Sequence, residues 1–160
     1  MKLRYTTVLG FAFALGFSAS GVSAVCPHLS GQYGYTFNIP NLQQTVAFDV
    51  KIAQKGCEKI TLTKSEAANK SQSSMQVLVT DGKLTPDLNE IGSADALSYR
   101  AHFEGNSLVL ENYEDTPASR LGSKTVLTLN ESGNLTAVTT IYDDAGNLLG
   151  VPNTTAMIKQ

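Results

Sequence analysis

The chain has 160 residues, with 12 Lys or Arg against 14 Asp or Glu, for a formal net charge of −2 at pH 7. The charges are evenly spread, so the chain lacks the basic stripe of a nucleic-acid-binding protein and the basic patch that holds a protein to a membrane surface. It contains no recognisable catalytic motif, metal-ligand cluster or phosphate-binding loop, so we expect no enzyme, no cofactor, no metal and no catalytic residue.

The first 24 residues have the pattern of a secretory signal peptide. Lys2 and Arg4 form a basic start, residues 8–17 are apolar and uncharged, and residues 22–24 present small side chains for cleavage. The apolar run is too short for a transmembrane helix, and no second candidate follows. We therefore expect an exported protein, periplasmic or secreted, whose mature chain of 136 residues forms one domain and begins at Val25.

Two alternatives concern the same segment. An uncleaved membrane anchor is disfavoured by the well-formed cleavage site. A lipid-modified Cys26 is disfavoured because Val25, which precedes it, is not the small residue that lipoprotein processing requires.

The two cysteines, Cys26 and Cys57, are predicted to form a disulfide, because an exported protein folds in an oxidising compartment. This bond would tether an N-terminus that would otherwise fray. A redox-active pair is the alternative, but it usually needs the close C-x-x-C spacing that is absent here.

The mature sequence alternates between apolar and polar residues with period two, which is typical of half-buried β-strands. The alternation is clearest over residues 32–39, 46–53 and 97–104. Weaker versions cover residues 58–63, 75–80, 107–113, 125–130, 135–142 and 154–158. No long amphipathic helix is visible between them.

Turn residues separate these predicted strands. Two-residue hairpin turns are predicted at 81–82 and 105–106, and longer ones at 131–134 and 144–147. Residues 40–44 and 114–123 read as loops, residues 65–74 have room for one helical turn capped by Ser65, and residues 85–88 for a short helix that begins at Pro86.

About eight to ten short strands joined mostly by hairpins must each bury one face and protect their edges. A closed antiparallel barrel and a two-layer β-sandwich both achieve this. We favour a single up-and-down β-barrel, because sequential hairpins need no crossing connections.

The start of the first predicted strand also resembles a known family. Gly31-Gln32-Tyr33 resembles the Gly-x-Trp motif of the lipocalins. Together with the meander of strands, the chain length, the export signal and the single disulfide, it makes the chain similar to the lipocalin-like (calycin) β-barrels. The resemblance implies a barrel whose interior can hold a small ligand.

Six aromatic residues are expected to point into the barrel and are the candidate ligand-binding residues. They are Tyr33, Tyr35, Phe37, Phe48, Tyr99 and Phe103. In a filled barrel they would be core, whereas in a hollow one they would line a pocket for an apolar ligand. The first functional hypothesis is therefore a non-catalytic exported barrel that binds a small apolar or amphipathic molecule.

Other functions stay open at this stage. A filled core would favour an envelope interaction, accessory or inhibitor protein that contacts a protein partner through residues 65–74 and 114–123. An eight-stranded outer-membrane barrel is permitted by the length, although several strands are short for one. A hydrolytic site assembled from scattered acids, such as Glu111, Glu114 and Asp115, is the least supported.

The remaining polar motifs favour ordinary roles. His102 is expected at a solvated strand position and His28 near the exposed N-terminus. Residues 142–147 lack the spacing of a calcium loop and are predicted to form a hairpin turn. Four N-x-[ST] sequons, which matter only in a glycosylating pathway, begin at Asn69, Asn130, Asn134 and Asn153.

The signal peptide makes a direct prediction. We expect protein recovered from the exported compartment to begin at Val25 and to have an intact mass about two units below that of the reduced mature chain, because one disulfide removes two hydrogens. Intact-mass spectrometry with and without a reductant checks both values. An N-terminus at Met1 would contradict the prediction.

Overall fold

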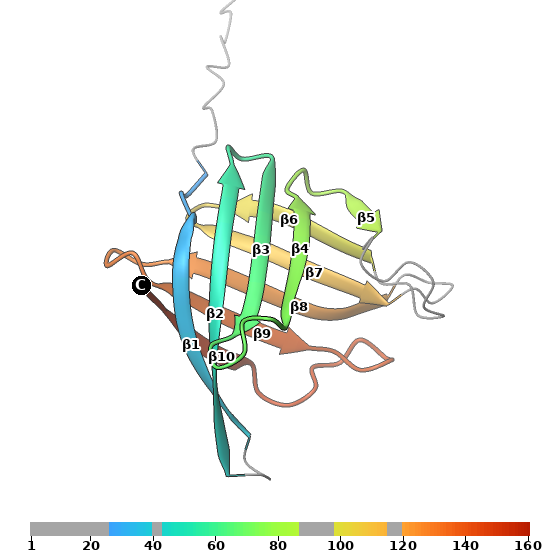
Figure 1. The fold of residues 1–160 in the computed structure, drawn as a ribbon. Helices are drawn as coiled ribbons and strands as arrows, with labels where there is room; N and C mark the ends of the chain where they lie inside the picture. The colour runs from blue at the N-terminus through green and yellow to red at the C-terminus, as the bar shows by residue number, and fades with distance from the viewer. Residues whose placement is uncertain (1–25, 40–42, 87–97, 115–119) are drawn as a thin grey trace, which may run out of the picture.

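The computed structural model describes residues 26–39, 43–86, 98–114 and 120–160. They form ten antiparallel strands wound into a nearly closed barrel (Figure 1). The strands are β1 (Gly31–Ile39), β2 (Gln44–Lys55), β3 (Lys59–Glu66), β4 (Ser73–Val79), β5 (Leu84–Pro86), β6 (Ser98–Glu104), β7 (Ser107–Glu114), β8 (Arg120–Leu129), β9 (Leu135–Ile141) and β10 (Asn153–Lys159). No helix within these residues is long and apolar enough to cross a membrane.

The strand order confirms the up-and-down barrel rather than the two-layer sandwich. It runs β4-β3-β2-β1-β10-β9-β8-β7-β6-β5, so each strand pairs with its neighbours in sequence except between β4 and β5. The first and last strands pair with each other, Tyr33 lying opposite Lys159. This pairing joins the two ends of the meander and leaves a single seam, between β4 and the β5–β6 hairpin.

The seam is bridged mainly by Tyr99, which lies on β6. Its hydroxyl donates to the carbonyl oxygen of Val77 at 3.2 Å and accepts from the backbone N–H of Val79 at 3.0 Å, both on β4. Beyond β4, the N–H of Gly82 donates to the carbonyl oxygen of Ala101 at 2.9 Å. A side chain of β6 therefore joins this strand to the edge strand β4, where the backbone ladder is interrupted.

Period-two alternation places one face of every strand inside the barrel. The register shows which residues share this face, since Tyr35 on β1 lies opposite Phe48 on β2. The buried apolar cluster draws on nearly all the strands and on the segment before β1. It consists of Leu29, Tyr33, Ile52, Ile60, Leu78, Tyr99, Ala101, Leu108, Leu110, Leu127, Leu135, Ala137 and Met157.

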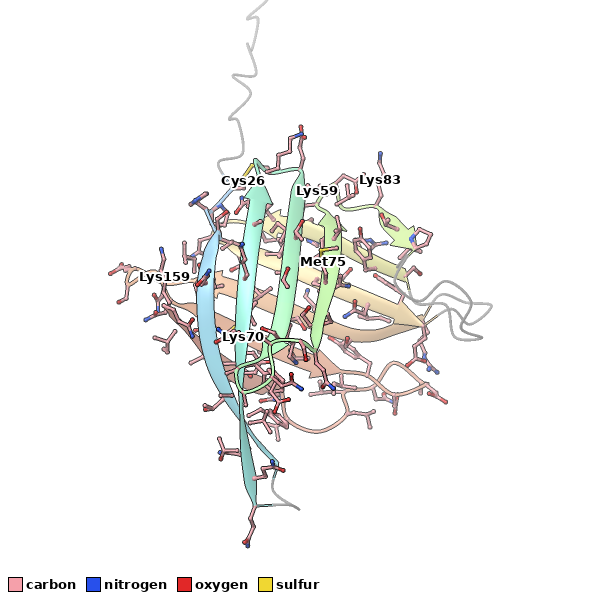
Figure 2. The ribbon with its side chains drawn as sticks, viewed as in Figure 1. Cys26, Lys59, Lys70, Met75, Lys83 and Lys159 are labelled. Carbon is pink, nitrogen blue, oxygen red and sulfur yellow. A yellow bond between two sulfur atoms is a disulfide. The ribbon has the colours of Figure 1, made fainter. Side chains whose placement is uncertain are left out.

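One end of the barrel, here called the closed end, is defined by Cys26, Leu29 and Cys57. The start of β1 and the β2–β3 turn lie at this end, and the β1–β2 hairpin lies at the opposite end (Figure 1). Figure 2 likewise shows Cys26 and Lys59 together at the closed end, with Lys70 in the β3–β4 connection far from them. The Leu29 side chain is fully buried in the core, so the N-terminal segment plugs this end.

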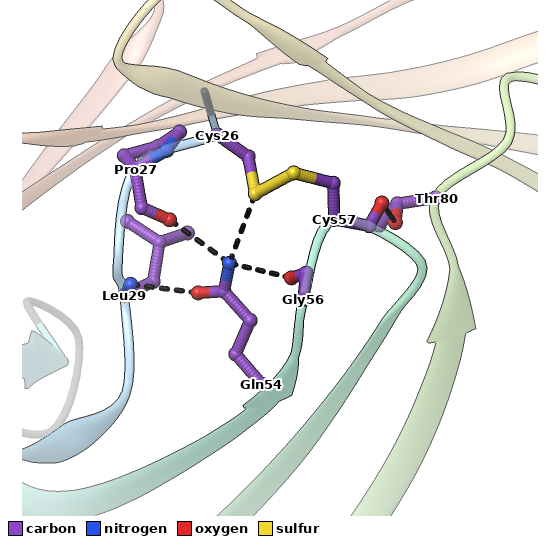
Figure 3. Close-up of a disulfide and its surroundings, with 7 residues drawn as sticks. All are labelled: Cys26, Pro27, Leu29, Gln54, Gly56, Cys57 and Thr80. Carbon is purple, nitrogen blue, oxygen red and sulfur yellow. Dashed lines mark hydrogen bonds between the residues drawn. A yellow bond between two sulfur atoms is a disulfide. The ribbon is translucent and has the colours of Figure 1, made fainter. Parts of the chain in front are cut away.

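The predicted disulfide joins Cys26 to Cys57 in the structure. Beside it, the side-chain amide of Gln54 holds the plug in place (Figure 3). Its oxygen accepts from the N–H of Leu29 at 2.7 Å, and its nitrogen donates to the carbonyl oxygens of Pro27 and Gly56 at 2.9 and 2.8 Å. The hydroxyl of Tyr33 donates to the carbonyl oxygen of Leu29 at 2.9 Å, which satisfies a further buried group.

Several local predictions were wrong. Residues 65–66 end β3 and residues 73–74 begin β4, with turns rather than a helical turn between them, so Ser65 caps no helix. Residues 81–82 do not connect paired strands, because β4 pairs with β3 and β5 pairs with β6. The cause is the seam, which interrupts the meander at this point.

Two further predictions lie partly outside the described residues. Thr85 and Pro86 belong to β5 rather than to a short helix, and residues 87–88 are not described. The expected loop 114–123 is shorter, because β7 reaches Glu114 and β8 begins at Arg120. An ion pair between these two residues accompanies their pairing across the strands. The hairpin at 105–106 is confirmed, with Gly105 at φ +57°.

The disulfide predicts a measurable contribution to stability. It closes a loop with a sequence separation of 31 residues, for which the chain-entropy model gives about 3 to 4 kcal/mol. We expect reduction to lower the free energy of unfolding by about this amount and the melting temperature by roughly 10 °C. Thermal melts with and without reductant check this, and an unchanged melting temperature after complete reduction would contradict it.

The seam gives a second prediction. Tyr99→Phe removes the hydroxyl that accepts from the part-buried N–H of Val79, so we expect the free energy of unfolding to fall by about 0.5 to 1.5 kcal/mol. Tyr142→Phe is the matched control, because Tyr142 is half-buried in the β9–β10 connection, away from the seam. Urea unfolding of both variants measures the difference, and equal losses would show that the bridge contributes nothing.

Candidate functional site

The barrel interior contains a cavity of about 860 Å³. Side chains from eight strands, β1–β4 and β7–β10, line this cavity. The lining residues are Tyr35, Phe37, Phe48, Val50, Ile52, Leu62, Lys64, Ser74, Met75, Gln76, Leu110, Thr125, Leu127, Ala137, Thr139, Asn153, Thr155 and Met157. The wall is mainly apolar, with hydroxyl and amide groups interspersed.

The cavity is floored by core residues and reaches solvent away from the closed end. Ile52, Leu127 and Met157 belong both to its wall and to the buried cluster. Phe37 and Met75, which also line it, are 44% and 58% exposed. The part of the barrel around these two exposed residues is called the mouth below.

The structure divides the six predicted aromatic residues between cavity and core. Tyr35, Phe37 and Phe48 line the cavity. The other three do not: Tyr33 and Tyr99 are buried in the core cluster, and Phe103 packs against it. Burial raises the pKa of the Tyr33 hydroxyl, in keeping with its place under the plug. A filled core and a lumen, which the sequence presented as alternatives, therefore coexist at opposite ends of one barrel.

The ammonium group of a lysine lies over a stacked aromatic pair near the mouth. The rings of Tyr35 and Phe48 stack with their centroids 5.2 Å apart and an interplanar angle of 25°. The Nζ atom of Lys64 lies 4.2 Å from the Phe48 centroid and 5.7 Å from that of Tyr35. At these distances the ammonium group is attracted to the ring faces.

Lys64 was not among the residues singled out from the sequence. Its strand was expected to end at Thr63, but β3 continues to Glu66. Extending the period-two alternation by one residue places Lys64 on the same face as Ile60 and Leu62. A basic residue that continues an apolar face is the signal by which it could have been found.

The polar part of the wall consists of hydroxyls, amides and this one ammonium group. Thr125 and Thr139 hydrogen-bond to each other through their hydroxyls at 3.0 Å, across β8 and β9. The wall contains no Asp, Glu, His or Cys among the described residues. It therefore offers hydrogen-bond partners and one positive charge to a ligand, but no general base and no thiolate.

The acids considered from the sequence as a hydrolytic site, Glu111 and Glu114, do not line the cavity. Glu111 is placed between Arg100 and Lys124, with N–O distances of 3.5 and 4.0 Å, and Glu114 pairs with Arg120. Asp115 lies outside the described residues. Among the residues described, no three His, Cys, Asp or Glu side chains gather in a way that could hold a metal ion.

His102 and the 142–147 segment also take structural roles. The Nε2 atom of His102 lies 2.8 Å from the Oε1 atom of Glu104, and this hydrogen bond lowers the pKa of the carboxyl. Asp143 accepts from the backbone N–H groups of Asn147 and Ala145. The first of these bonds is the largest cause of the lowered pKa of Asp143. The segment is thus a turn that stabilises itself, as its sequence predicted.

No protein-family model matches the chain, and no curated protein matches it by sequence. Solved structures do match. A REP1-NXSQ fatty acid transporter superposes with a TM-score of 0.56 at 10% identity, covering 82% of this chain and 96% of that one. The fluorescent protein UnaG gives 0.57 at 13% identity, covering 82% and 96%. The zebrafish ileal bile acid-binding protein, complexed with cholic acid, gives 0.55 at 13%, covering 82% and 98%.

The fold is a lipocalin-like (calycin) β-barrel. Both the closed meander and these superpositions show it, and they confirm the architecture implied by Gly31-Gln32-Tyr33. At such low identity the similarity concerns the path of the chain alone. What a barrel of this sequence binds must therefore be argued from its own wall residues.

Proposed function

We propose that this protein is exported and binds a small apolar or amphipathic molecule in its barrel cavity, without covalent chemistry. The observation that carries the proposal is the cavity itself. Its volume of about 860 Å³ lies within the range of about 300 to 1,000 Å³ typical of small-molecule sites. A mainly apolar wall with a few placed polar groups is the lining expected of such a site.

Three further observations support this proposal. The described lining residues include none of the acids, histidine or thiol that hydrolytic chemistry uses, so their composition suits binding better than catalysis. The similar structures are named for fatty acid transport and for bile acid binding. The Cys26–Cys57 disulfide and the signal pattern of residues 1–24 both fit a protein that works outside the cytoplasm.

The cavity also separates this proposal from an accessory or inhibitor protein that acts only through its loops. Such a protein has no need of a hollow interior, and leaving a cavity in a core costs about 1 kcal/mol or more for each missing methyl group. An internal space of this size is therefore better explained by a ligand than by a binding surface on the outside.

A pair of neighbouring threonines on β10 tests the proposal. Thr155 lines the cavity, whereas Thr154 is exposed on the outer face. We expect Thr155→Phe to fill part of the cavity and to weaken binding of the uncharged fluorescent probe N-phenyl-1-naphthylamine by at least about tenfold. Thr154→Phe adds the same ring outside the barrel and should change the affinity by less than about twofold.

The measurement is a fluorescence titration of folded protein, with thermal melts to show that each variant is folded. If the wild type fails to bind the probe, or if both variants bind it as the wild type does, the cavity is not the binding site. Native mass spectrometry of protein from its own compartment complements the titration. An adduct of a few hundred daltons that Thr155→Phe abolishes would give the mass of the natural ligand.

A further inference from the structure

We infer that the ligand is an anionic amphipath, bound with its charged head group at Lys64 near the mouth and its apolar part deeper in the barrel. This inference rests on the proposed function and specifies the ligand class of the same cavity. It begins from a charge imbalance in the wall. Lys64 is the one cationic side chain among the described lining residues, and no carboxylate accompanies it.

Lys64 has no ion-pair partner among the described carboxylates, a property it shares with Lys51, Lys55, Lys59 and Lys159. Lys64 differs from these four lysines because it lines the cavity. The ammonium group of Lys64 instead rests over the Phe48 and Tyr35 rings. It keeps its three donors available to a ligand on the cavity side.

Position along the barrel sets the orientation of the ligand. Lys64 is exposed and lies opposite Ser74 on β4, close to the mouth. The deeper wall is apolar, formed by Leu110, Leu127 and Ala137 from the far side of the barrel. A head group at Lys64 keeps partial hydration, while an apolar chain that enters the deeper part removes its surface from water.

Among the described residues, one acid lines a surface hollow together with Lys64, and its position is consistent with the same orientation. Glu66 follows Lys64 on the same face of β3 and lines a shallow surface hollow beside it, outside the main cavity. A carboxylate there weakens the attraction of Lys64 for anions that approach from solvent. It leaves the side of the ammonium group that faces the cavity free of negative charge.

Two probes with the same ring system test the inference. 8-Anilinonaphthalene-1-sulfonate carries a sulfonate, and N-phenyl-1-naphthylamine is the same molecule without it. We expect Lys64→Met to weaken binding of the sulfonate probe about threefold to fivefold, the upper part of the range for a solvent-accessible ion pair. Binding of the uncharged probe should change by less than about twofold. Lys64→Arg should retain the affinity for the sulfonate probe, because it keeps the charge.

Matched controls separate the charge effect from damage to the cavity. Lys51→Met removes a lysine from the exposed outer face of β2 and should leave both affinities unchanged. Thr155→Phe should weaken binding of both probes alike, because the added ring fills part of the cavity that their common ring system would occupy. Glu66→Gln should strengthen binding of the sulfonate probe alone. If Lys64→Met does not fold, Lys64→Gln takes its place in the same comparison.

The outcomes distinguish this inference from the proposed function. Equal effects of the Lys64 substitutions on both probes, or no effect on either, would overturn the head-group assignment while leaving a binding cavity. Failure of the wild type to bind the uncharged probe would overturn the proposed function, and this inference with it. A selective loss of the sulfonate probe, restored by arginine, is the result that supports an anionic ligand.

Discussion

The plug at the closed end is the constraint on which the rest of the barrel depends. An antiparallel barrel of this size has more interior than its own strand side chains fill, so the chain must either pack that space or leave it hollow. Leu29 and Tyr33 pack one end of it, and the disulfide and Gln54 keep them there. With that end filled, the hollow part is confined to the other end, where it meets solvent.

This asymmetry gives the molecule two regions with different physical demands. The closed end packs apolar side chains around polar groups that are hydrogen-bonded to Gln54 and Tyr33. The cavity end exposes Phe37 and Met75 and combines apolar residues with hydroxyls and one ammonium group. The packed closed end can supply most of the contacts that stabilise the fold. The cavity end can therefore remain hollow, although a protein interior is normally close-packed.

The seam shows how a barrel of ten strands closes where its ladder is interrupted. Tyr99 takes over two backbone hydrogen bonds of β4 with a single hydroxyl, and the rest of its ring belongs to the core. This explains why an aromatic residue expected in a pocket is instead structural. Tyr99 lies beside the edge strand β4, where a side chain must pack its ring in the core and also hydrogen-bond with its polar end. Tyrosine has both properties.

Local patterns in the sequence determined the strands, most hairpins and the disulfide, because period-two alternation, turn glycines and two cysteines that follow a signal-peptide pattern are signals that need no tertiary context. They also placed Tyr35 and Phe48 on an inward face. Only the tertiary structure decided which inward residues meet a cavity, because Tyr33 and Tyr35 share one face of β1 and differ only in their distance from the plug. Leu29 and Gln54 acquire their roles through residues distant in sequence, which no local pattern specifies.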